Sequence, residues 1–198
     1  MQERPAITRV SGKEAAPAGR APAIVLADPK YAHNVGMVIR LASCYGIGQV
    51  WYTGERVGLD ISPRKRLPRE ERMRGYADVE IINCDYPFEQ FADAAPVAVE
   101  VREKSEPLHS FEHPENALYV FGPEDGSIAR GLLSHCHRFV VIPTRHCLNL
   151  ATAVATVLWD RQYKAWLGGA LDTLPTPGEF EGRGLVSLPD DGFGGGGR

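Results

Sequence analysis

The stretch IPTRHCLNLATAVA, residues 142–155, joins two structural patterns. Up to Pro143 it continues an apolar run typical of a buried strand, and from Leu148 it has the apolar pattern of a core helix. The residues between them with reactive or hydrogen-bonding side chains are Arg145, His146, Cys147 and Asn149. Strand, polar turn and helix form the repeating unit of α/β domains, so this stretch predicts that class of fold.

The chain on either side repeats the same alternation. Six short runs rich in β-forming residues lie at 23–28, 49–54, 78–82, 96–101, 117–122 and 138–143. Helical patterns lie at 35–45, near 87–94, at 127–134 and at 148–167. Several of the runs are apolar almost throughout, as strands buried on both faces are. We expect an α/β domain with a largely parallel six-stranded sheet flanked by helices, its first helix capped by Asn34 and stopped by Gly46.

The 198 residues, 43% hydrophobic and 24% charged, suit one soluble domain. We expect one folded domain at 21–168 between a flexible arm at 1–20 and a Gly/Pro-rich, disordered tail at 169–198. Neither a signal peptide nor an apolar run of membrane-spanning length is apparent, and the four cysteines form no CxxC pair. These features predict a cytoplasmic protein with reduced thiols and no membrane contact.

Three loops that follow predicted strands have unusual polar content: AHNVG (32–36), FGPEDGS (121–127) and IPTRHCLN (142–149). Ligands of parallel α/β sheets bind at such strand ends. FGPEDGS lacks both phosphate-loop patterns, and its acids would repel a phosphate. Two interpretations of this loop remain open. It is an ordinary turn, or it binds a ligand that has positive charge or donor groups.

Arg40 lies in the apolar run MVIRLA, which predicts partial burial and therefore a partner. One interpretation is a structural ion pair with Glu124 or Glu100, and the other is an arginine that handles an anionic substrate.

Metal and nucleophile chemistry are weakly supported. His135, Cys136 and His137, and the pair His146 and Cys147, lack a second group at zinc-site spacing, so we expect no metal. Neighbouring side chains seldom face one another, which also disfavours Cys147 as a nucleophile activated by His146.

The segment SPRKRLPREERMRGY (62–76) concentrates positive charge in a chain whose net charge is −3. Its basic residues are Arg64, Lys65, Arg66, Arg69, Arg72 and Arg74. A solvated surface loop is the default interpretation, but this cluster is also the best candidate for contact with a nucleic-acid backbone.

Three motifs in this order resemble those of the SpoU (TrmH-type) branch of the SPOUT RNA methyltransferases, over about residues 22–167. They are the N-x5-R of Asn34 and Arg40, the loop FGPEDGS, and IPTRHCLNLATAVA. The resemblance implies methyl transfer from S-adenosylmethionine (SAM) to a ribose 2′-hydroxyl of tRNA or rRNA. It also implies a SPOUT-type fold with a C-terminal trefoil knot, and a homodimer.

The resemblance further implies roles for individual residues. The cofactor contacts would be Val99, Glu100, Gly122, Ile142, Cys147 and Leu148. The catalytic set would be Asn34, Arg40, Glu124 and Asn149, with Asn149 bracing the arginine. A guanidinium is a poor base, so Arg40 is expected to hold a substrate phosphate and stabilise the developing alkoxide.

The chain departs from the family pattern at one point. Cys147 stands where relatives usually have serine, and Leu150–Ala151 where they have Val–Ser. Two alternatives therefore stay open: a non-catalytic RNA-binding relative, and a base-methylating enzyme. The lack of an extra RNA-binding domain favours tRNA slightly over rRNA. Small apolar residues around the 148–167 helix predict burial against the sheet on one side and a second subunit on the other.

Overall fold

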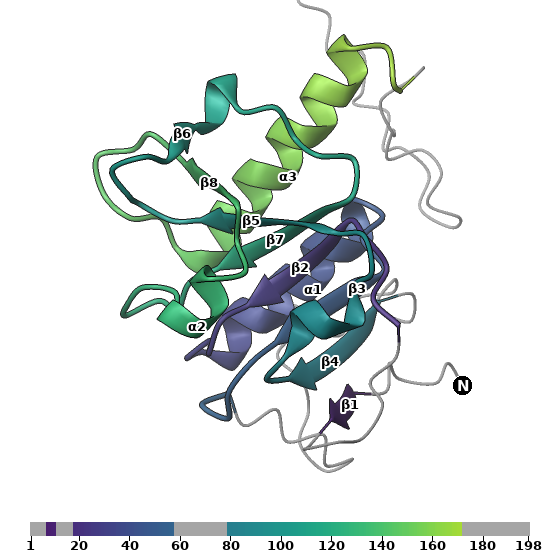
Figure 1. Cartoon of the computed structure of the whole chain (residues 1–198), viewed down its shortest axis with the longest axis vertical. Helices are drawn as coiled ribbons and strands as arrows, with labels where there is room; N and C mark the ends of the chain where they lie inside the picture. Colours follow the sequence, from purple (N-terminus) through teal and green to yellow (C-terminus); the bar gives the residue numbers. More distant parts are fainter. Residues whose placement is uncertain (1–6, 11–17, 58–78, 172–198) are drawn as a thin grey trace, which may run out of the picture. The chain divides into compact units, whose positions relative to one another are not determined.

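The computed structural model describes residues 7–10, 18–57 and 79–171. The chain divides into two compact units, Met1–Gln162 and Tyr163–Arg198. The first contains an eight-stranded parallel sheet in the order β1-β4-β3-β2-β7-β5-β8-β6 (Figure 1). The strands are β1 (Ile7–Val10), β2 (Ala23–Leu26), β3 (Gln49–Tyr52), β4 (Glu80–Cys84), β5 (Ala95–Val99), β6 (Glu106–Pro107), β7 (Ala117–Phe121) and β8 (Arg138–Val141).

Helices cover both faces of this sheet. They are α1 (Ala32–Cys44), α2 (Arg130–Leu133), α3 (Leu150–Leu167) and the 3-10 turns η3 (Pro87–Gln90) and η4 (Leu108–Ser110). Helix α1 and the first half of α3 share a hydrophobic core with one face, where Val35 and Val154 pack with Tyr119. On the opposite face, Trp51 and residues around η3 and α2 form a second core. The central strands are thus buried on both sides, which explains their continuous apolar sequences.

All six predicted strands are present, and the α/β class with a parallel sheet is confirmed. The expected count of six was wrong, because β1 and β6 add one short strand at each edge. β6 has only two residues and includes a proline, which leaves no strand pattern to recognise. β1 lies in the segment expected to be an arm, and its pairing with β4 is parallel.

The boundaries of α1 differ from expectation at one end. The helix begins at Ala32 with Tyr31 as the N-cap, so Asn34 is its third residue and not its cap. The predicted stop at Gly46 is confirmed, since Gly46 has a φ of 68°. Ile47 N–H donates to the Ala42 carbonyl at 2.8 Å and Gly46 N–H to that of Ser43 at 3.3 Å, which is a Schellman motif.

Some expectations concern residues beyond the described ranges. The six basic residues at 64–74 are outside them, as are residues 1–6, 11–17 and 172–198 of the proposed arm and tail. Within the described ranges, no helix has the length and apolar character needed to cross a membrane.

Candidate functional site

The three polar loops meet at one edge of the sheet. Strands β2, β7, β5 and β8 are consecutive neighbours, and all are parallel. At their carboxyl ends Phe121 pairs in register with Leu26 and Val99, and Val99 pairs with Val140. The loops after these strands therefore start at the same level and surround one site.

A hydrogen-bond chain joins three of the four residues implied by the family resemblance. Asn149 Nδ2 donates to Asn34 Oδ1 at 3.0 Å, and Asn34 Nδ2 donates to Glu124 Oε1 at 2.7 Å. Asn34 is only 1% exposed. The buried amide of Asn34 thus joins Asn149, 115 residues later in the chain, to Glu124, 90 residues later.

Glu124 is held by three N–H groups. Besides the amide of Asn34, the backbone N–H groups of Lys30 and Tyr31 donate to its carboxylate at 2.8 and 3.4 Å. Partial burial alone would raise the pKa of Glu124, but the hydrogen bonds from Asn34 and from the backbone together lower it. Glu124 is therefore an ionised acceptor at the start of α1, and a poor base.

Arg40 differs from the sequence-based expectation. It is exposed rather than partly buried, and no residue in the described ranges forms a hydrogen bond or ion pair with its guanidinium. Arg40 lies six residues after Asn34 in α1, which places it nearly two turns further along and on another side of the helix. Asn149 consequently binds Asn34 and does not brace the arginine, and the ion pair with Glu124 or Glu100 is not formed.

Asn149 has a second role, as the N-cap of α3. Its Oδ1 accepts hydrogen bonds from Ala151 N–H at 2.9 Å and Thr152 N–H at 3.4 Å. Earlier in the same loop, Thr144 Oγ1 donates to the His146 carbonyl at 2.8 Å. Cys147 is an exposed free thiol between these two anchored points.

The six residues expected to contact SAM lie at the ends of the three adjacent strands β7, β5 and β8. Val99 and Glu100 end or follow β5, Gly122 follows β7, and Ile142, Cys147 and Leu148 follow β8. None of the six is fully buried. Backbone groups and partly exposed apolar side chains of this kind suit an adenosine and a methionine chain.

The chain is closely packed at Gly122. A Cβ at position 122 would lie 3.3 Å from Ile128 Cγ1 and 3.6 Å from Glu100 Oε2, so the loops after β5 and β7 approach each other closely here. Glu100 Oε2 also accepts a hydrogen bond from Ile128 N–H at 3.0 Å. The carboxylate of Glu100 thus fixes the two loops to each other.

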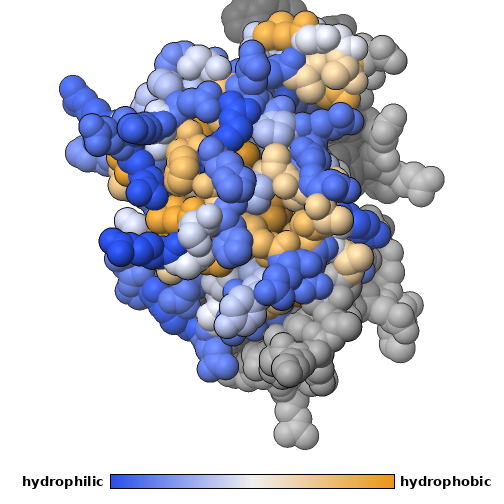
Figure 2. Space-filling view, viewed as in Figure 1, coloured by the Kyte–Doolittle hydropathy of each residue, from blue (hydrophilic) through white to orange (hydrophobic). Residues whose placement is uncertain are grey.

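A hollow of about 350 Å³ adjoins these loops on the side of α2. Its lining residues are Arg102, Ile128, Arg130, Leu133 and Ser134. No acid in the described ranges forms an ion pair with Arg102 or Arg130. On the side of the view where α2 lies, strongly hydrophilic surface borders hydrophobic patches (Figure 2). The hollow therefore offers positive charge beside apolar surface.

Comparison with known proteins identifies the family. The model of the SpoU rRNA methylase family matches residues 21–159. The chain belongs to the SpoU rRNA methylase family. No curated protein sequence matches it. Membership of this family indicates a SAM-dependent RNA methyltransferase.

Several solved structures share the fold. A TrmH/SpoU tRNA modifying enzyme from A. aeolicus has a TM-score of 0.61 at 16% identity, covering 77% of this chain and 79% of its own. AviRb from Streptomyces viridochromogenes, solved with AdoMet, has a TM-score of 0.61 at 17% identity, covering 74% of this chain and 61% of its own. A structure described as explaining 2-OH methylation of C/U34 on tRNA has a TM-score of 0.59 at 24% identity, covering 74% and 96%.

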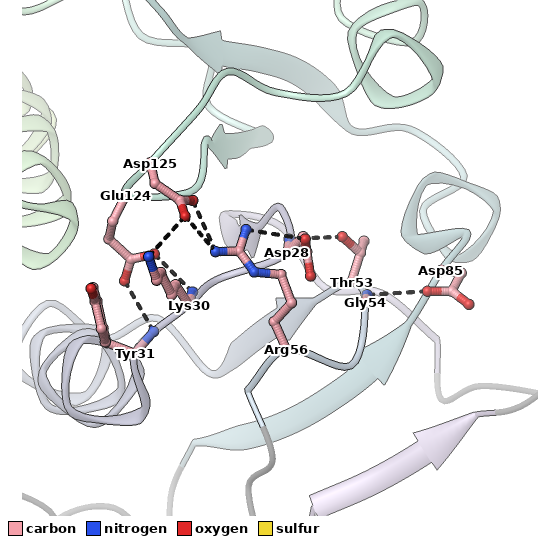
Figure 3. Close-up of polar contacts among 9 residues, drawn as sticks. All are labelled: Asp28, Lys30, Tyr31, Thr53, Gly54, Arg56, Asp85, Glu124 and Asp125. Atoms are coloured by element: carbon pink, nitrogen blue, oxygen red, sulfur yellow. Dashed lines mark hydrogen bonds and ion pairs between the residues drawn. The ribbon is translucent and has the colours of Figure 1, made fainter.

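In this SpoU-family chain, an ion-pair network that the sequence did not reveal borders the site (Figure 3). Asp125 accepts from Arg56 Nη2 at 2.9 Å and lies 3.0 Å from Lys30 Nζ. Arg56 Nη1 also reaches Asp28 at 3.3 Å, and Asp28 N–H donates to Thr53 Oγ1 at 3.0 Å. Arg56 and then Lys30 lower the pKa of Asp125. The sequence signals for this network were the charged residues after β2 and β3 and the acids of the FGPEDGS loop.

The thiols and histidines form no second site. No group of three His, Cys, Asp or Glu side chains able to hold a metal occurs among the described residues. Burial raises the pKa of Cys136 to about 12, whereas Cys147 is exposed. Cys136 is therefore an inert core residue.

Proposed function

We propose that this SpoU-family protein transfers a methyl group from SAM to a ribose 2′-hydroxyl of RNA. The observation that carries the proposal is the hydrogen-bonded chain Asn149–Asn34–Glu124, which assembles the three family motifs at one strand edge and leaves Arg40 exposed. The likeness to a structure concerned with 2-OH methylation of tRNA, which spans 96% of that chain, supports a ribose target in tRNA over rRNA.

In this proposal the four motif residues divide into two roles. Arg40 is the catalytic residue: its guanidinium, which has no partner among the described residues, holds a substrate phosphate and stabilises the alkoxide that develops on the ribose oxygen. Asn34, Glu124 and Asn149 are positioning residues, since the buried amide and the two loops it joins fix the start of α1. Glu124 does not take the hydroxyl proton, because three N–H donors already stabilise its ionised form, and in this proposal the proton passes to water as the methyl group leaves the sulfonium of SAM.

The proposed cofactor site consists of Val99, Glu100, Gly122, Ile142, Cys147 and Leu148. SAM supplies an electrophilic methyl group when bound. The chain contributes apolar contacts through Val99, Ile142 and Leu148, and orientation through the backbone of the Gly122 loop. Glu100 acts on this site by holding the Gly122 loop through Ile128 N–H. Cys147 in place of the usual serine leaves the three positioning residues intact.

RNA binding in this proposal uses positively charged residues. The segment with Arg64, Lys65, Arg66, Arg69, Arg72 and Arg74 is one candidate for phosphate contacts. Arg102 and Arg130 beside the hollow are another. Salt dependence of RNA binding measures the number of such contacts.

We further propose the homodimer and the C-terminal trefoil knot of the SpoU family. Two large apolar side chains on the helices that cover one sheet face support a subunit interface: Met37 on α1 is 40% exposed and Trp159 on α3 is 51% exposed. A monomeric mass by light scattering at micromolar concentration would contradict the dimer.

A calorimetric and kinetic comparison of Arg40→Ala with wild type tests the proposal. The variant should bind SAM like wild type and lose methyl transfer at least ~100-fold, since the lost group acts on the transition state. Arg20→Ala is the matched control, because Arg20 is an exposed arginine at the opposite strand edge, paired with Glu80 at 3.1 Å. Absence of SAM binding to the wild-type protein would overturn the proposed cofactor. Binding of RNA without any methyl transfer would establish the non-catalytic alternative.

A further inference from the structure

Two exposed aromatic rings stand at the start of α1, beside the hydrogen-bonded chain. Tyr31 is 44% exposed, and its ring stacks on that of His33 with centroids 5.4 Å apart and an interplanar angle of 26°. His33 is exposed as well. Figure 3 shows Tyr31 next to Glu124, at the point where the chain enters the helix. Neither ring contributes to the core or to the motif residues.

The backbone beneath these rings is fixed on both sides. Tyr31 N–H donates to Glu124 Oε1 at 3.4 Å, and the Tyr31 carbonyl accepts from Asn34 N–H at 3.0 Å. The side chain of Tyr31, although at the N-cap position, makes no capping hydrogen bond. The helix start thus does not need the phenol group, and the ring is held at a defined place relative to Asn34.

Charges of both signs lie near the pair, because Glu124 accepts from Tyr31 N–H and Lys30 is paired with Asp125. Lys30 Nζ lies 5.3 Å from the centre of the Tyr31 ring, and Asp125 raises the pKa of Lys30, which keeps the ammonium charged. Arg40 follows His33 by seven residues on the same side of α1, about 10 Å along the helix axis. Two stacked, exposed rings offer a flat face to a nucleobase, and Arg40, further along the same side of α1, offers a cation to the anionic phosphate of a nucleotide.

We infer that the Tyr31–His33 pair is a stacking platform that receives a nucleobase of the RNA substrate and places its ribose beside the motif residues. The inference rests on the proposed function for the identity of the substrate. It assigns base contact to the start of α1, while phosphate contact belongs to Arg40. A flat platform accepts any base, so the pair contributes affinity and placement rather than sequence preference.

Binding of a short single-stranded ribo-oligonucleotide of mixed sequence, compared with the same backbone carrying abasic sites, tests this inference. Tyr31→Leu should weaken binding of the base-containing probe about 5- to 150-fold, corresponding to ~1–3 kcal/mol for one stacked base, and leave the abasic probe unchanged. Tyr31→Phe keeps the ring and should bind both probes like wild type. The control is Tyr86→Leu, because Tyr86 is 68% exposed and follows β4, two strands away from β2.

Three results would overturn the platform: equal weakening of both probes in Tyr31→Leu, no weakening at all, or the same weakening in Tyr86→Leu. The rings could stack on a base of the RNA or on the adenine of SAM, and SAM affinity measured on the same variants separates the two. A selective loss of SAM binding would assign the rings to the adenine and reject the inference. The oligonucleotide comparison requires no catalysis. If wild type transfers no methyl group, the proposed enzymatic function fails while the base-dependent binding still decides the platform.

Discussion

Replacing Asn34 by aspartate changes one atom of the buried amide and reverses its hydrogen-bonding role. In the wild-type protein the amide of Asn34 donates to Glu124 Oε1 at 2.7 Å, and an aspartate would place a second carboxylate at that distance. At an effective dielectric constant of about 20, two unit charges this close repel by about 6 kcal/mol. Position 34 is 1% exposed, so water cannot relieve the repulsion.

Uptake of one proton by the carboxylate pair is the less costly outcome. Holding a carboxyl of ordinary pKa near 4 in the protonated state costs about 4 kcal/mol at pH 7 and about 1.5 kcal/mol at pH 5. The protonated oxygen then donates to the other carboxylate and restores the bond. We therefore expect Asn34→Asp to lower the free energy of unfolding by about 4 kcal/mol at pH 7 and far less at pH 5. The pair's pKa in the folded state is raised, so the destabilisation begins above the unfolded-state pKa and grows with pH.

Urea denaturation followed by tryptophan fluorescence at pH 5 and pH 7 measures this difference. Asn34→Ala is the first control, since it removes the donor without adding charge and should be destabilised equally at both pH values. Asn116→Asp is the second, because Asn116 is exposed and donates to the Asp93 carbonyl, so its change should stay within about 0.5 kcal/mol. Equal destabilisation of Asn34→Asp at pH 5 and pH 7 would refute the carboxylate contact.

Three further predictions concern neighbouring groups. Glu124→Gln should lower the free energy of unfolding by about 1–2 kcal/mol at neutral pH. Because the folded-state pKa of Glu124 lies below its ordinary value of 4.5, the difference from wild type should vanish as pH falls through that lowered pKa. A difference that persists in acid would contradict this prediction. Asn149→Ala removes the cap of α3 and the donor to Asn34, and should lower the free energy of unfolding, measured by urea denaturation, by about 1–3 kcal/mol. Asn149→Asp keeps the cap and should lower it less. The reverse order would reject the capping geometry. A thiol reagent at pH 8, followed by mass spectrometry, should label Cys147 before Cys136, whose pKa is raised to about 12, and equal labelling of the native protein would disprove the burial of Cys136.

The sheet could be predicted because its central strands are buried on both faces. That burial requires apolar residues at nearly every position, so β2, β3 and β7 stand out in the sequence. The edge strands β1 and β6 have no such requirement, and they were missed. Polar loops after apolar strands also located the site edge, since parallel strands place their carboxyl ends together.

The partners of individual side chains could not be predicted in the same way. Asn34 has the local features of a helix cap, but it is the buried third residue of α1. The hydrogen bond that holds it there is accepted by Glu124, 90 residues later in the chain. Arg40 lies in an apolar run, but the pattern did not show that its own side of α1 faces outward. The Arg56–Asp125 pair joins loops 69 residues apart, and although Asp125 lies in the FGPEDGS motif, its partner Arg56 belongs to none. Tertiary contacts of this kind leave no local trace.

Analysis of the methylated product tests the central proposal most directly. Wild-type protein is incubated with methyl-labelled SAM and a tRNA pool, and the RNA is digested to nucleosides and examined by mass spectrometry. The label should appear on ribose as 2′-O-methylated nucleoside, remain in Arg20→Ala, and be absent with Arg40→Ala. Label on a base would assign the chain to base methylation, and unlabelled RNA despite bound SAM would contradict the proposed activity.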